Sequence, residues 1–431
     1  MSLEWSFSEL GKEAINASRP FSFKTYPQVI FVNTGDVLFG KFLHKTICDG
    51  KGLPGQAKKA LKQNDILLSE IRPGNGRFAY VDFEPNQHVV STKFMVIESL
   101  GRVIPRFLYH VLTNQFSLDE FQHIAESRSG TFPQITFDSI AHFPIPVPSK
   151  QEQIALVNFL DTLDDRITLL RETNATLEAI AQALFKSWFV DFDPVHAKMQ
   201  GTQPEGMDEQ TAALFPDSFE ESELGLVPAG WEVKTIGDVV EIVGGGTPDT
   251  KEATYWEPSE HCWTTPKDLS GNKSPILLDT DRKLSTKGLK KVGSGLLPKG
   301  TLLMSSRAPI GYLAIAQVPL AINQGYIAIL ENNSALPPLY MLFWCQYNMD
   351  TVKGRANGST FMEISKKAFR PIPILTPPQS IIDSFVDVVA TLFDNLVENE
   401  KQAQTLADIR DTLLPRLISG QLRVGDVDAT T

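Results

Sequence analysis

The chain contains one structural unit twice, and each copy ends in a long helix with a heptad pattern. Leu396 follows Ile167 by 229 positions, and Leu413 follows Leu184 by the same interval. Apolar steps of three and four residues predict coiled-coil helices over about 149–189 and 379–418. The predicted apolar seams are Leu160, Leu163, Ile167, Leu170, Leu177, Leu184 and Trp188 in the first helix, and Val389, Leu392, Leu396, Leu406, Leu413 and Leu417 in the second. A duplicated domain-plus-helix unit predicts pseudo-two-fold symmetry, which suits duplex DNA or a pair of identical subunits.

Three polar residues interrupt these seams, namely Asn174 in the first helix and Asn399 and Arg410 in the second. They can be tolerated near solvent, or they can fix the register of an antiparallel pairing between the two helices. The sequence leaves both interpretations open. A helix of about 40 residues would span roughly 60 Å, enough to hold two domains apart.

Shorter anchors repeat as well. They comprise Gly130-Thr131-Phe132 and Pro144-Ile145-Pro146 in the first copy, and Ser359-Thr360-Phe361 and Pro371-Ile372-Pro373 in the second. In the globular parts, Arg72, Gly76 and Ala79 match Arg307, Gly311 and Ala314, each pair 235 positions apart. The sequence between these anchors diverges strongly. Two copies with one scaffold and different variable surfaces are expected to recognise two different targets.

The predicted fold class is α+β: two mixed α/β domains separated by two long antiparallel coiled-coil helices. The predicted segments are domain 1 (1–148), helix region 1 (149–195), an acidic solvated connector (196–230), domain 2 (231–376), and helix region 2 with the C-terminal tail (377–431). Strands are expected over 66–68, 78–81 and 94–97, with a turn at 73–76. Pro415 and Gly420 are expected to end the second helix.

Charge is distributed unevenly along the chain, whose formal net charge is −11. Residues 21–150 carry 14 basic against 11 acidic side chains, and residues 231–376 carry 16 against 13. Residues 201–230 carry seven acids and no base. This separation fits a DNA-facing surface on each domain and an acidic protein-facing scaffold.

Cysteine usage and hydropathy favour a cytoplasmic protein. Cys48, Cys262 and Cys345 lie far apart without a CxxC pair, as isolated thiols do in a reducing compartment. No stretch approaches the about 18 consecutive apolar residues of a membrane span, and the N-terminus lacks signal-peptide features. We therefore expect no membrane association.

Motifs for catalysis are missing. The chain has no Asp/Asn-Pro-Pro-Tyr/Phe tetrapeptide for amine methylation, no phosphate-binding P-loop, and no dinucleotide-binding glycine motif after a strand. Its seven histidines lack metal-ligand spacing. The run 244–248 is glycine-rich but precedes no helix, and indicates a loop close to a ligand backbone. We expect no catalytic residue, metal or cofactor in this chain.

The remaining chemistry is that of DNA binding. Lysines with interspersed glycines in loop 41–62 suit phosphate contacts, although such a loop is more often simply solvated. Arginine can bind guanine, and asparagine or glutamine can bind adenine, yet the repeated Arg72 and Arg307 fit a structural role slightly better. The candidate DNA-binding residues are Lys41, Lys45, Lys58, Lys59, Arg72, Asn75, Arg77, Gly245, Thr247, Lys267, Arg307, Asn323 and Gln324.

Over nearly its full length the chain resembles the specificity (S) subunits of type I restriction–modification systems. The stretches that carry the resemblance are Phe185-Lys186-Ser187-Trp188-Phe189-Val190-Asp191-Phe192-Asp193-Pro194, Ala213-Leu214-Phe215-Pro216-Asp217-Ser218-Phe219, Gly230-Trp231-Glu232-Val233, Ser305-Ser306-Arg307-Ala308-Pro309-Ile310-Gly311, Asn323-Gln324-Gly325, and Leu413-Leu414-Pro415-Arg416-Leu417-Ile418-Ser419-Gly420. Each stretch is modest, but their order is highly specific.

The resemblance implies two target recognition domains that each read half of a split site in double-stranded DNA. It implies that the helices set the gap between half-sites and dock two modification (M) subunits. The M subunits would methylate adenine with S-adenosylmethionine, and restriction (R) subunits would add translocation and cleavage driven by ATP and Mg. Base contacts are not transferable within this family, so the candidate residues above rest on chemistry alone.

Two other classes of protein stay open on the sequence alone. A fused or atypical DNA methyltransferase or nuclease would be recognised by S-adenosylmethionine binding to the isolated chain. A coiled-coil adaptor without a DNA role would be excluded by sequence-specific duplex binding of either globular half.

Overall fold

The computed structural model describes residues 5–128, 130–272, 274–307, 309–332, 334–358 and 362–427. The repeat anchor Ser359-Thr360-Phe361 and Ala308 of another predicted motif lie outside these ranges. The chain forms two compact units. Unit 1 comprises Met1–Arg166 and Thr405–Thr431, and unit 2 comprises Ile167–Gln404. Each long helix therefore contributes one segment to each unit.

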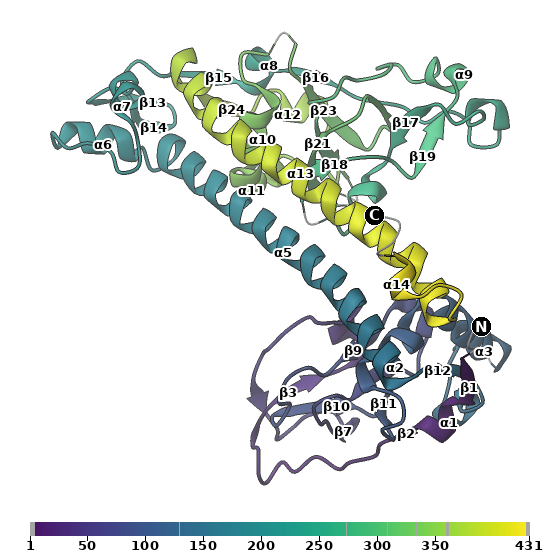
Figure 1. Ribbon diagram of the computed structural model, residues 1–431. Helices are drawn as coiled ribbons and strands as arrows, with labels where there is room; N and C mark the ends of the chain where they lie inside the picture. Colours follow the sequence, from purple (N-terminus) through teal and green to yellow (C-terminus); the bar gives the residue numbers. More distant parts are fainter. Residues whose placement is uncertain are drawn as a thin grey trace. The chain divides into compact units, whose positions relative to one another are not determined.

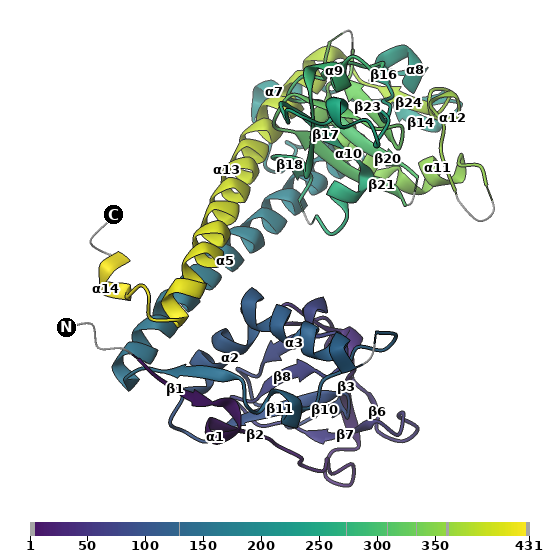
Figure 2. The ribbon, with the colours of Figure 1, turned by 90° about the vertical axis from the view of Figure 1, so that its right-hand side faces the viewer.

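Unit 1 contains two four-stranded sheets, of orders β2-β11-β8-β9 and β6-β3-β10-β7. The strands are β2 (Ala14–Asn16), β3 (Gln28–Val32), β6 (Cys48–Asp49), β7 (Ala57–Ala60), β8 (Ile66–Ser69), β9 (Phe78–Tyr80), β10 (His88–Ser91) and β11 (Phe94–Ser99). Helices α2 (Pro105–Thr113) and α3 (Gln115–Arg128) lie over the first sheet (Figure 2). The predicted strands at 66–68, 78–81 and 94–97 are confirmed.

The apolar run of β8 shows why these strands carry few polar residues. Ile66 and Leu68 face the core that α2 and α3 complete, whereas Leu67 faces the second sheet. Because side chains alternate across a strand, both faces of β8 are buried and every position is apolar or small. A strand that is buried on both faces reads as a continuous hydrophobic run.

Unit 2 repeats this plan with sheets of orders β16-β23-β20-β21-β18 and β19-β17-β22. The strands are β16 (Glu241–Val243), β17 (His261–Thr264), β18 (Ile276–Leu277), β19 (Arg282–Leu284), β20 (Leu302–Ser306), β21 (Ile310–Ala316), β22 (Leu320–Ile322) and β23 (Tyr326–Leu330). The larger sheet packs against α10 (Pro338–Tyr347), which precedes α11 (Met349–Gly354). Leu302 and Met304 share the core with α10, and Leu303 faces the smaller sheet.

The C-terminal parts of the two copies contain equivalent elements at a constant interval in the sequence. Strand β12 (Pro144–Val147) pairs with β1 (Ser6–Glu9), and β24 (Pro373–Thr376) pairs with β15 (Glu232–Thr235), both antiparallel. The short helices α4 (Phe137–Ile140) and α12 (Lys366–Phe369) are again 229 positions apart. Helices α5 (Lys150–Phe189) and α13 (Gln379–Ile418) each have 40 residues at that same offset. The predicted repeat and fold class are confirmed.

Local chemistry fixes the ends of the long helices. At the start of α5, Ser149 and Glu152 exchange side-chain-to-backbone hydrogen bonds of 3.0 and 3.3 Å, which is a capping box. The prediction that Pro415 ends α13 was wrong, because the helix continues to Ile418. Pro415 removes one amide donor from the last turn, and burial of Leu417 and Ile418 in the unit 1 core outweighs that loss. Gly420, at φ +76°, follows the helix as a left-handed residue, as predicted.

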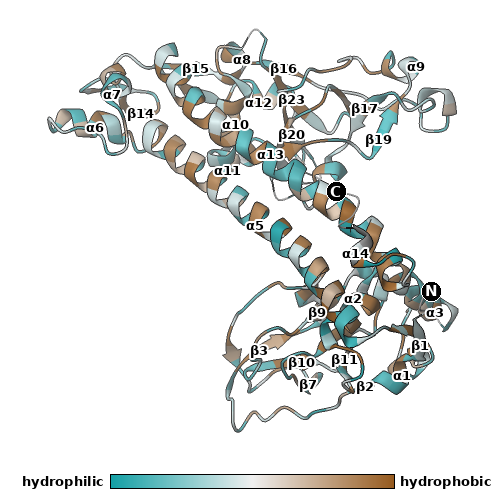
Figure 3. Cartoon of the chain, viewed as in Figure 1, coloured by the Kyte–Doolittle hydropathy of each residue, from teal (hydrophilic) through white to brown (hydrophobic). Residues whose placement is uncertain are grey.

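Within each unit the two helix segments run antiparallel, and their apolar and polar residues alternate along the chain (Figure 3). In unit 1, Leu156 and Leu160 share a core with Leu417 and Ile418. In unit 2, the aromatic ring of Phe185 contacts that of Phe385. The heptad spacing holds to Ala181, after which Phe185 is buried and Leu184 only partly buried. The prediction is therefore one residue out at Leu184 and correct again at the buried Trp188, because Phe185 packs against Tyr340 and Phe343 of α10.

The acidic segment 196–230 is more ordered than the sequence predicts. It holds most of α6 (Asp193–Met199), then α7 (Glu209–Leu214) and a hairpin of β13 (Phe219–Ser222) with β14 (Gly225–Pro228). Phe215 is buried edge-on against Trp188 of α5. Burial of a few apolar residues between the acids anchors this connector to unit 2 (Figure 1).

Candidate nucleic-acid interface

The candidate interface of unit 1 begins at a tight hairpin. Strands β4 (Val37–Leu38) and β5 (Lys41–Phe42) are joined by Phe39 and Gly40, whose φ angles are +44° and +83°. Positive φ at both central residues is the pattern of a type I′ hairpin. Lys41 is exposed directly after the turn, and Lys45 is exposed four residues later.

A second turn supports this hairpin. It is the short 3₁₀ segment Pro73–Asn75 between β8 and β9, with Arg72 and Gly76 both left-handed. The amide of Phe39 donates to the carbonyl oxygen of Gly76 at 2.7 Å, and the amide of Gly40 donates to that of Phe78 at 2.9 Å. The structure thereby brings together the predicted residues Lys41, Arg72, Asn75 and Arg77, which are separated by up to 36 positions in sequence.

The arginines of this turn differ in their surroundings. Arg77 donates from Nη1 to the carbonyl oxygens of Gly35 and Val37, at 3.1 and 2.9 Å, and so braces the hairpin. Arg72 is exposed, and its guanidinium makes no hydrogen bond or ion pair with a residue in the described ranges. Its side chain is available for a ligand, whereas that of Arg77 is largely engaged.

Two predicted lysines lie on β7, in the other sheet of unit 1. Lys58 is exposed. Lys59 is half-buried, and its Nζ donates to the carbonyl oxygen of Phe94 at 2.6 Å. Burial lowers the pKa of Lys59, which weakens the case for a phosphate contact.

In unit 2 the predicted residues converge from four loops. Strands β17 and β22 are parallel, so the segments that follow them, which contain Lys267 and Asn323, emerge at one edge. Thr247 donates from Oγ1 to Oε1 of Gln324 at 2.6 Å. The amide of Ser306, next to Arg307, donates to the carbonyl oxygen of Gly325 at 2.8 Å. Lys267 and Gln324 are exposed at this edge.

Gly245 has a structural reason to be glycine. A Cβ on Gly245 would lie 1.8 Å from the carbonyl oxygen of Ile322, and the amide of Gly246 donates to that same oxygen at 3.0 Å. Close packing against β22 therefore explains Gly245. Thr247, two residues further on, is exposed.

The glycine and the alanine of each repeated anchor have a structural role. Gly76 and Gly311 have φ angles of +69° and +105°, where a side chain is strained. Ala79 and Ala314 are fully buried. Arg307 lies 3.8 Å from a carboxylate oxygen of Glu363, so its environment differs from that of Arg72.

Sequence reasoning missed a basic group in unit 2. Lys287, Lys290 and Lys291 are exposed on and after the short helix α9 (Thr286–Leu289). The ammonium groups of Lys287 and Lys291 lie 5.3 and 5.7 Å from the ring centroid of Tyr255. The sequence feature that could have revealed this group is the run Lys287-Gly288-Leu289-Lys290-Lys291, which looks like an ordinary solvated loop.

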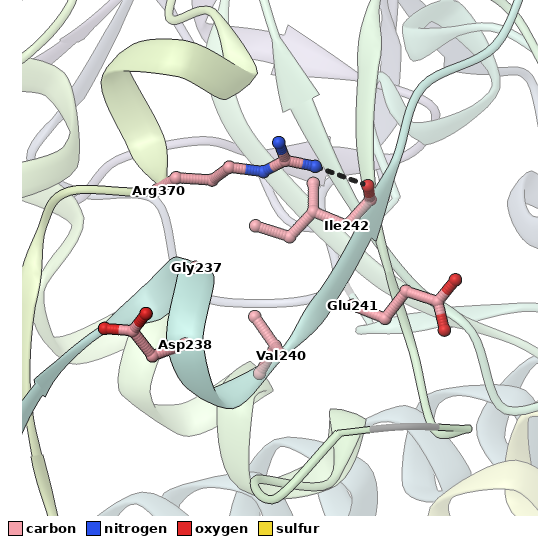
Figure 4. A pocket seen from close by; sticks show the side chains of 6 residues that line it. All are labelled: Gly237, Asp238, Val240, Glu241, Ile242 and Arg370. Atoms are coloured by element: carbon pink, nitrogen blue, oxygen red, sulfur yellow. Dashed lines mark hydrogen bonds between the residues drawn. The ribbon is translucent and has the colours of Figure 1, made fainter.

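One open pocket of about 460 Å³ lies elsewhere in unit 2 (Figure 4). Arg370 donates from Nη2 to the carbonyl oxygen of Ile242 across it, at 3.4 Å. Gly237 packs against the Arg370 side chain, just as Gly11 packs against Ala141 in unit 1. The pocket thus forms where the larger Arg370 replaces Ala141 at a repeated helix contact. Within the described ranges, no three His, Cys, Asp or Glu side chains gather as metal ligands do.

The predicted seam residues of the helices face inward. Those buried are Leu160, Ile167, Leu170, Asn174, Trp188, Leu396 and Leu417, and those partly buried are Leu163, Leu177, Leu184, Leu392, Asn399, Leu406 and Leu413. Asn174 donates from Nδ2 to the carbonyl oxygen of Leu396 at 3.1 Å, and Arg410 donates to Asp164 at 2.5 Å. These polar residues make specific contacts between the helices and are not merely solvated. Among the described helices, none combines the length and hydropathy that a membrane crossing requires.

Comparison with known proteins defines the class of this fold. The family model described as "Type I restriction modification DNA specificity domain" matches residues 7–179 and 228–406, one match in each copy. The chain is 38% identical to the type I restriction enzyme HindI specificity subunit of Haemophilus influenzae, over 97% of this chain and 100% of that protein. It is 35% identical to the MjaIX specificity subunit of Methanocaldococcus jannaschii over 44% of each protein.

A solved structure shares the fold. The type I restriction–modification S subunit from M. genitalium superimposes with a TM-score of 0.56 at 16% identity, over 96% of each chain. The chain belongs to the family of type I restriction–modification specificity subunits.

Proposed function

We propose that this chain reads a bipartite DNA site, with one half-site bound by each unit, as the non-catalytic subunit of a type I restriction–modification complex. One observation carries this proposal. The two units share most of their strand order and their repeated anchors, but their exposed basic and amide side chains stand on different loops. In unit 1 these loops are the 39–45 hairpin and the 72–77 turn, and in unit 2 they are 244–248, 266–269 and 323–325. One scaffold with two surfaces suits an asymmetric, split target.

Phosphate contacts in each unit would come from exposed lysines, which position the domain without specifying sequence. The exposed lysines are Lys41, Lys45 and Lys58 in unit 1, and Lys267, Lys287, Lys290 and Lys291 in unit 2. Base contacts would come from Arg72 and Asn75 in unit 1, and from Asn323 and Gln324 in unit 2. Arginine and the amides have the donor patterns for guanine and adenine edges in the major groove.

Two M subunits would dock on the outer faces of the helices. Ile180 of α5 and Ile409 of α13 are exposed and occupy equivalent positions in the repeat, 229 residues apart. An exposed isoleucine on each copy supports two like partners. R subunits would join through the M subunits. The chain itself would need no cofactor, since S-adenosylmethionine, ATP and Mg would be bound by its partners in the cytoplasm.

The number of base pairs between the half-sites would be set by α5 and α13, because each helix contributes a segment to both units. This function explains why both helices keep the same length of 40 residues. The globular surfaces would then be free to vary.

Methylation mapping tests the proposal. The chain is co-expressed with its M subunit in a host without other adenine methylases, and methylated adenines are mapped by single-molecule sequencing. A split motif with a fixed gap, lost when the chain is omitted, is the expected result. Methylation by the chain alone, or a complex that methylates without a split motif, would contradict it.

A further inference from the structure

We propose that Phe39 is an apolar wedge that packs against the faces of bases in the unit 1 half-site and unstacks one base step. This inference rests on the proposed DNA-reading function and names a mode of contact within it. It concerns unit 1 alone.

The backbone at Phe39 argues for a role of its side chain. Its φ angle is +44°, a region that bulky side chains rarely adopt. Two-residue hairpins of this type favour asparagine or glycine at the first central position. A phenylalanine at this position makes the turn less stable than asparagine or glycine would. Strained residues of this kind cluster at ligand-binding sites.

The ring is exposed but firmly mounted. Its exposed fraction is 63%, although phenylalanine is among the residues most often buried. One side of the ring covers Gly76, where a Cβ would lie 2.4 Å from a ring carbon, and the ring meets that of Phe78 edge-on at 6.0 Å. Two backbone hydrogen bonds fix the turn that carries it. A ring held in this way loses little conformational entropy on binding.

The surroundings identify the partner as DNA. Lys41 and Lys45 are exposed on the same loop, and Arg72 is exposed in the turn beneath it. Leu43 adds a second apolar side chain, 53% exposed. The stretch 37–47 contains no acidic residue, and the adjacent Asp36 is held by the amide of Asn33 and by His44. An apolar tip flanked by cations fits stacked bases between phosphates, and proteins that bend DNA insert phenylalanine or leucine in this way.

At the matching glycine of unit 2 a different side chain takes the place of the phenylalanine ring. The glycine that matches Gly76 is Gly311, and the space above it is filled by the Met349 side chain from α11. The two units therefore differ in mode of contact as well as in their basic residues.

The test uses the full complex of the chain with its M subunits, on its mapped site. 2-Aminopurine, which brightens when it is unstacked, is placed in turn at each position of both half-sites. The adenines that the M subunits would flip out for methylation are set aside, because they brighten whether or not Phe39 is present. At the other positions we expect wild-type binding to brighten one or two adjacent bases in a single half-site. Phe39→Gly relieves the backbone and removes the ring, so we expect loss of this signal and about tenfold weaker binding, equal to about 1.4 kcal/mol.

Two variants separate the ring from the fold. Phe39→Trp restores an aromatic face and should keep the signal within about twofold. Phe7→Ala removes an equally exposed ring (60%) from β1 and should change neither signal nor affinity. Unchanged brightening and affinity in Phe39→Gly, or a wild-type complex that binds its site and brightens no position other than the methylated adenines, would overturn the wedge. Failure of the wild-type complex to bind any split site would instead contradict the proposed function.

Discussion

Asn174 of α5 accepts a 3.0 Å hydrogen bond at its Oδ1 from the side-chain amide of Asn399 of α13. Asn174 also donates to the carbonyl oxygen of Leu396, and it is only 5% exposed. A buried asparagine on an apolar seam satisfies its polar atoms only in one alignment of the helices. The pair therefore specifies the antiparallel register of this helix segment in unit 2.

Substitutions of Asn174 and Asn399 should have non-additive effects on the free energy of unfolding. Asn174→Ala and Asn399→Ala are each expected to destabilise the chain by about 1 kcal/mol, with a coupling energy of about 0.5–1.5 kcal/mol in the double variant. Urea unfolding measures all three. Asn395→Ala, at an exposed position of α13, corrects for the change in helix propensity. Strictly additive effects would show that the two amides do not act together.

The α2–α5 contact of unit 1 should depend on pH through Asp161. Its carboxylate accepts from Arg106 Nε at 2.9 Å and lies 3.0 Å from His110 Nε2. Burial alone would raise the pKa of Asp161, but the bond with His110 and the charge of Arg106 outweigh it, and the pKa is lowered. Because the folded pKa lies below the unfolded one, the stabilisation is present above about pH 4 and is lost as the pH falls through the folded pKa.

Asp161→Asn should therefore lower stability at pH 7 by about 1.5–3 kcal/mol, the usual contribution of hydrogen bonds to a charged group. The difference from wild type should shrink below about pH 4. Urea unfolding across pH 3–8 checks this, with the exposed Asp165→Asn as the matched control. A difference independent of pH would mean that the charge of Asp161 contributes nothing.

Substitution of Gly245 should destabilise unit 2, whereas substitution of the adjacent Gly246 should not. A Cβ at Gly245 would collide with the backbone of Ile322, so Gly245→Ala should destabilise unit 2 by about 1–3 kcal/mol. Gly246→Ala meets nothing closer than 4.0 Å and should be tolerated. Thermal unfolding compares the two variants. Equal stabilities would show that the loop moves away from β22 without cost.

The exposed isoleucines should control partner stoichiometry. Ile180→Arg and Ile409→Arg place a charge on the proposed docking faces, and each should cost the complex one M subunit. The double variant should bind none. Native mass spectrometry counts the subunits, with Ala175→Arg at another exposed position of α5 as the control. Retention of two M subunits by the double variant would place the docking surface elsewhere.

Periodicity and repetition predicted most of the fold. Both long helices, the strands around β8 and the duplicated plan follow from spacing of apolar residues, because burial on a fixed face repeats with the geometry of the element. The switch from Leu184 to Phe185 was not predictable, since it depends on where α5 meets the globular core. The order of the connector was underestimated because its apolar anchors, such as Phe215, Phe219 and Val227, are isolated among acidic residues.

The candidate site was predicted less completely. Chemistry suggested Arg72, Asn323 and Gln324. The structure joins Gln324 to Thr247 and Asn323 to Thr264 through contacts that sequence order hides. Lys59 looked like its neighbour Lys58, but strand alternation turns it toward the carbonyl of Phe94. The sequence gives no indication that Phe39 belongs to the site. Its positive φ is imposed by the hairpin and cannot be inferred from the residue type.

The central claim is that the two units read different halves of one site. Genome-wide methylation mapping of complexes containing Arg72→Ala or Gln324→Ala tests it most directly. We predict that Arg72→Ala relaxes the sequence of one half-site only and that Gln324→Ala relaxes only the other, with the gap unchanged in both. Relaxation of the same half-site by both variants would contradict the assignment of one half-site to each unit.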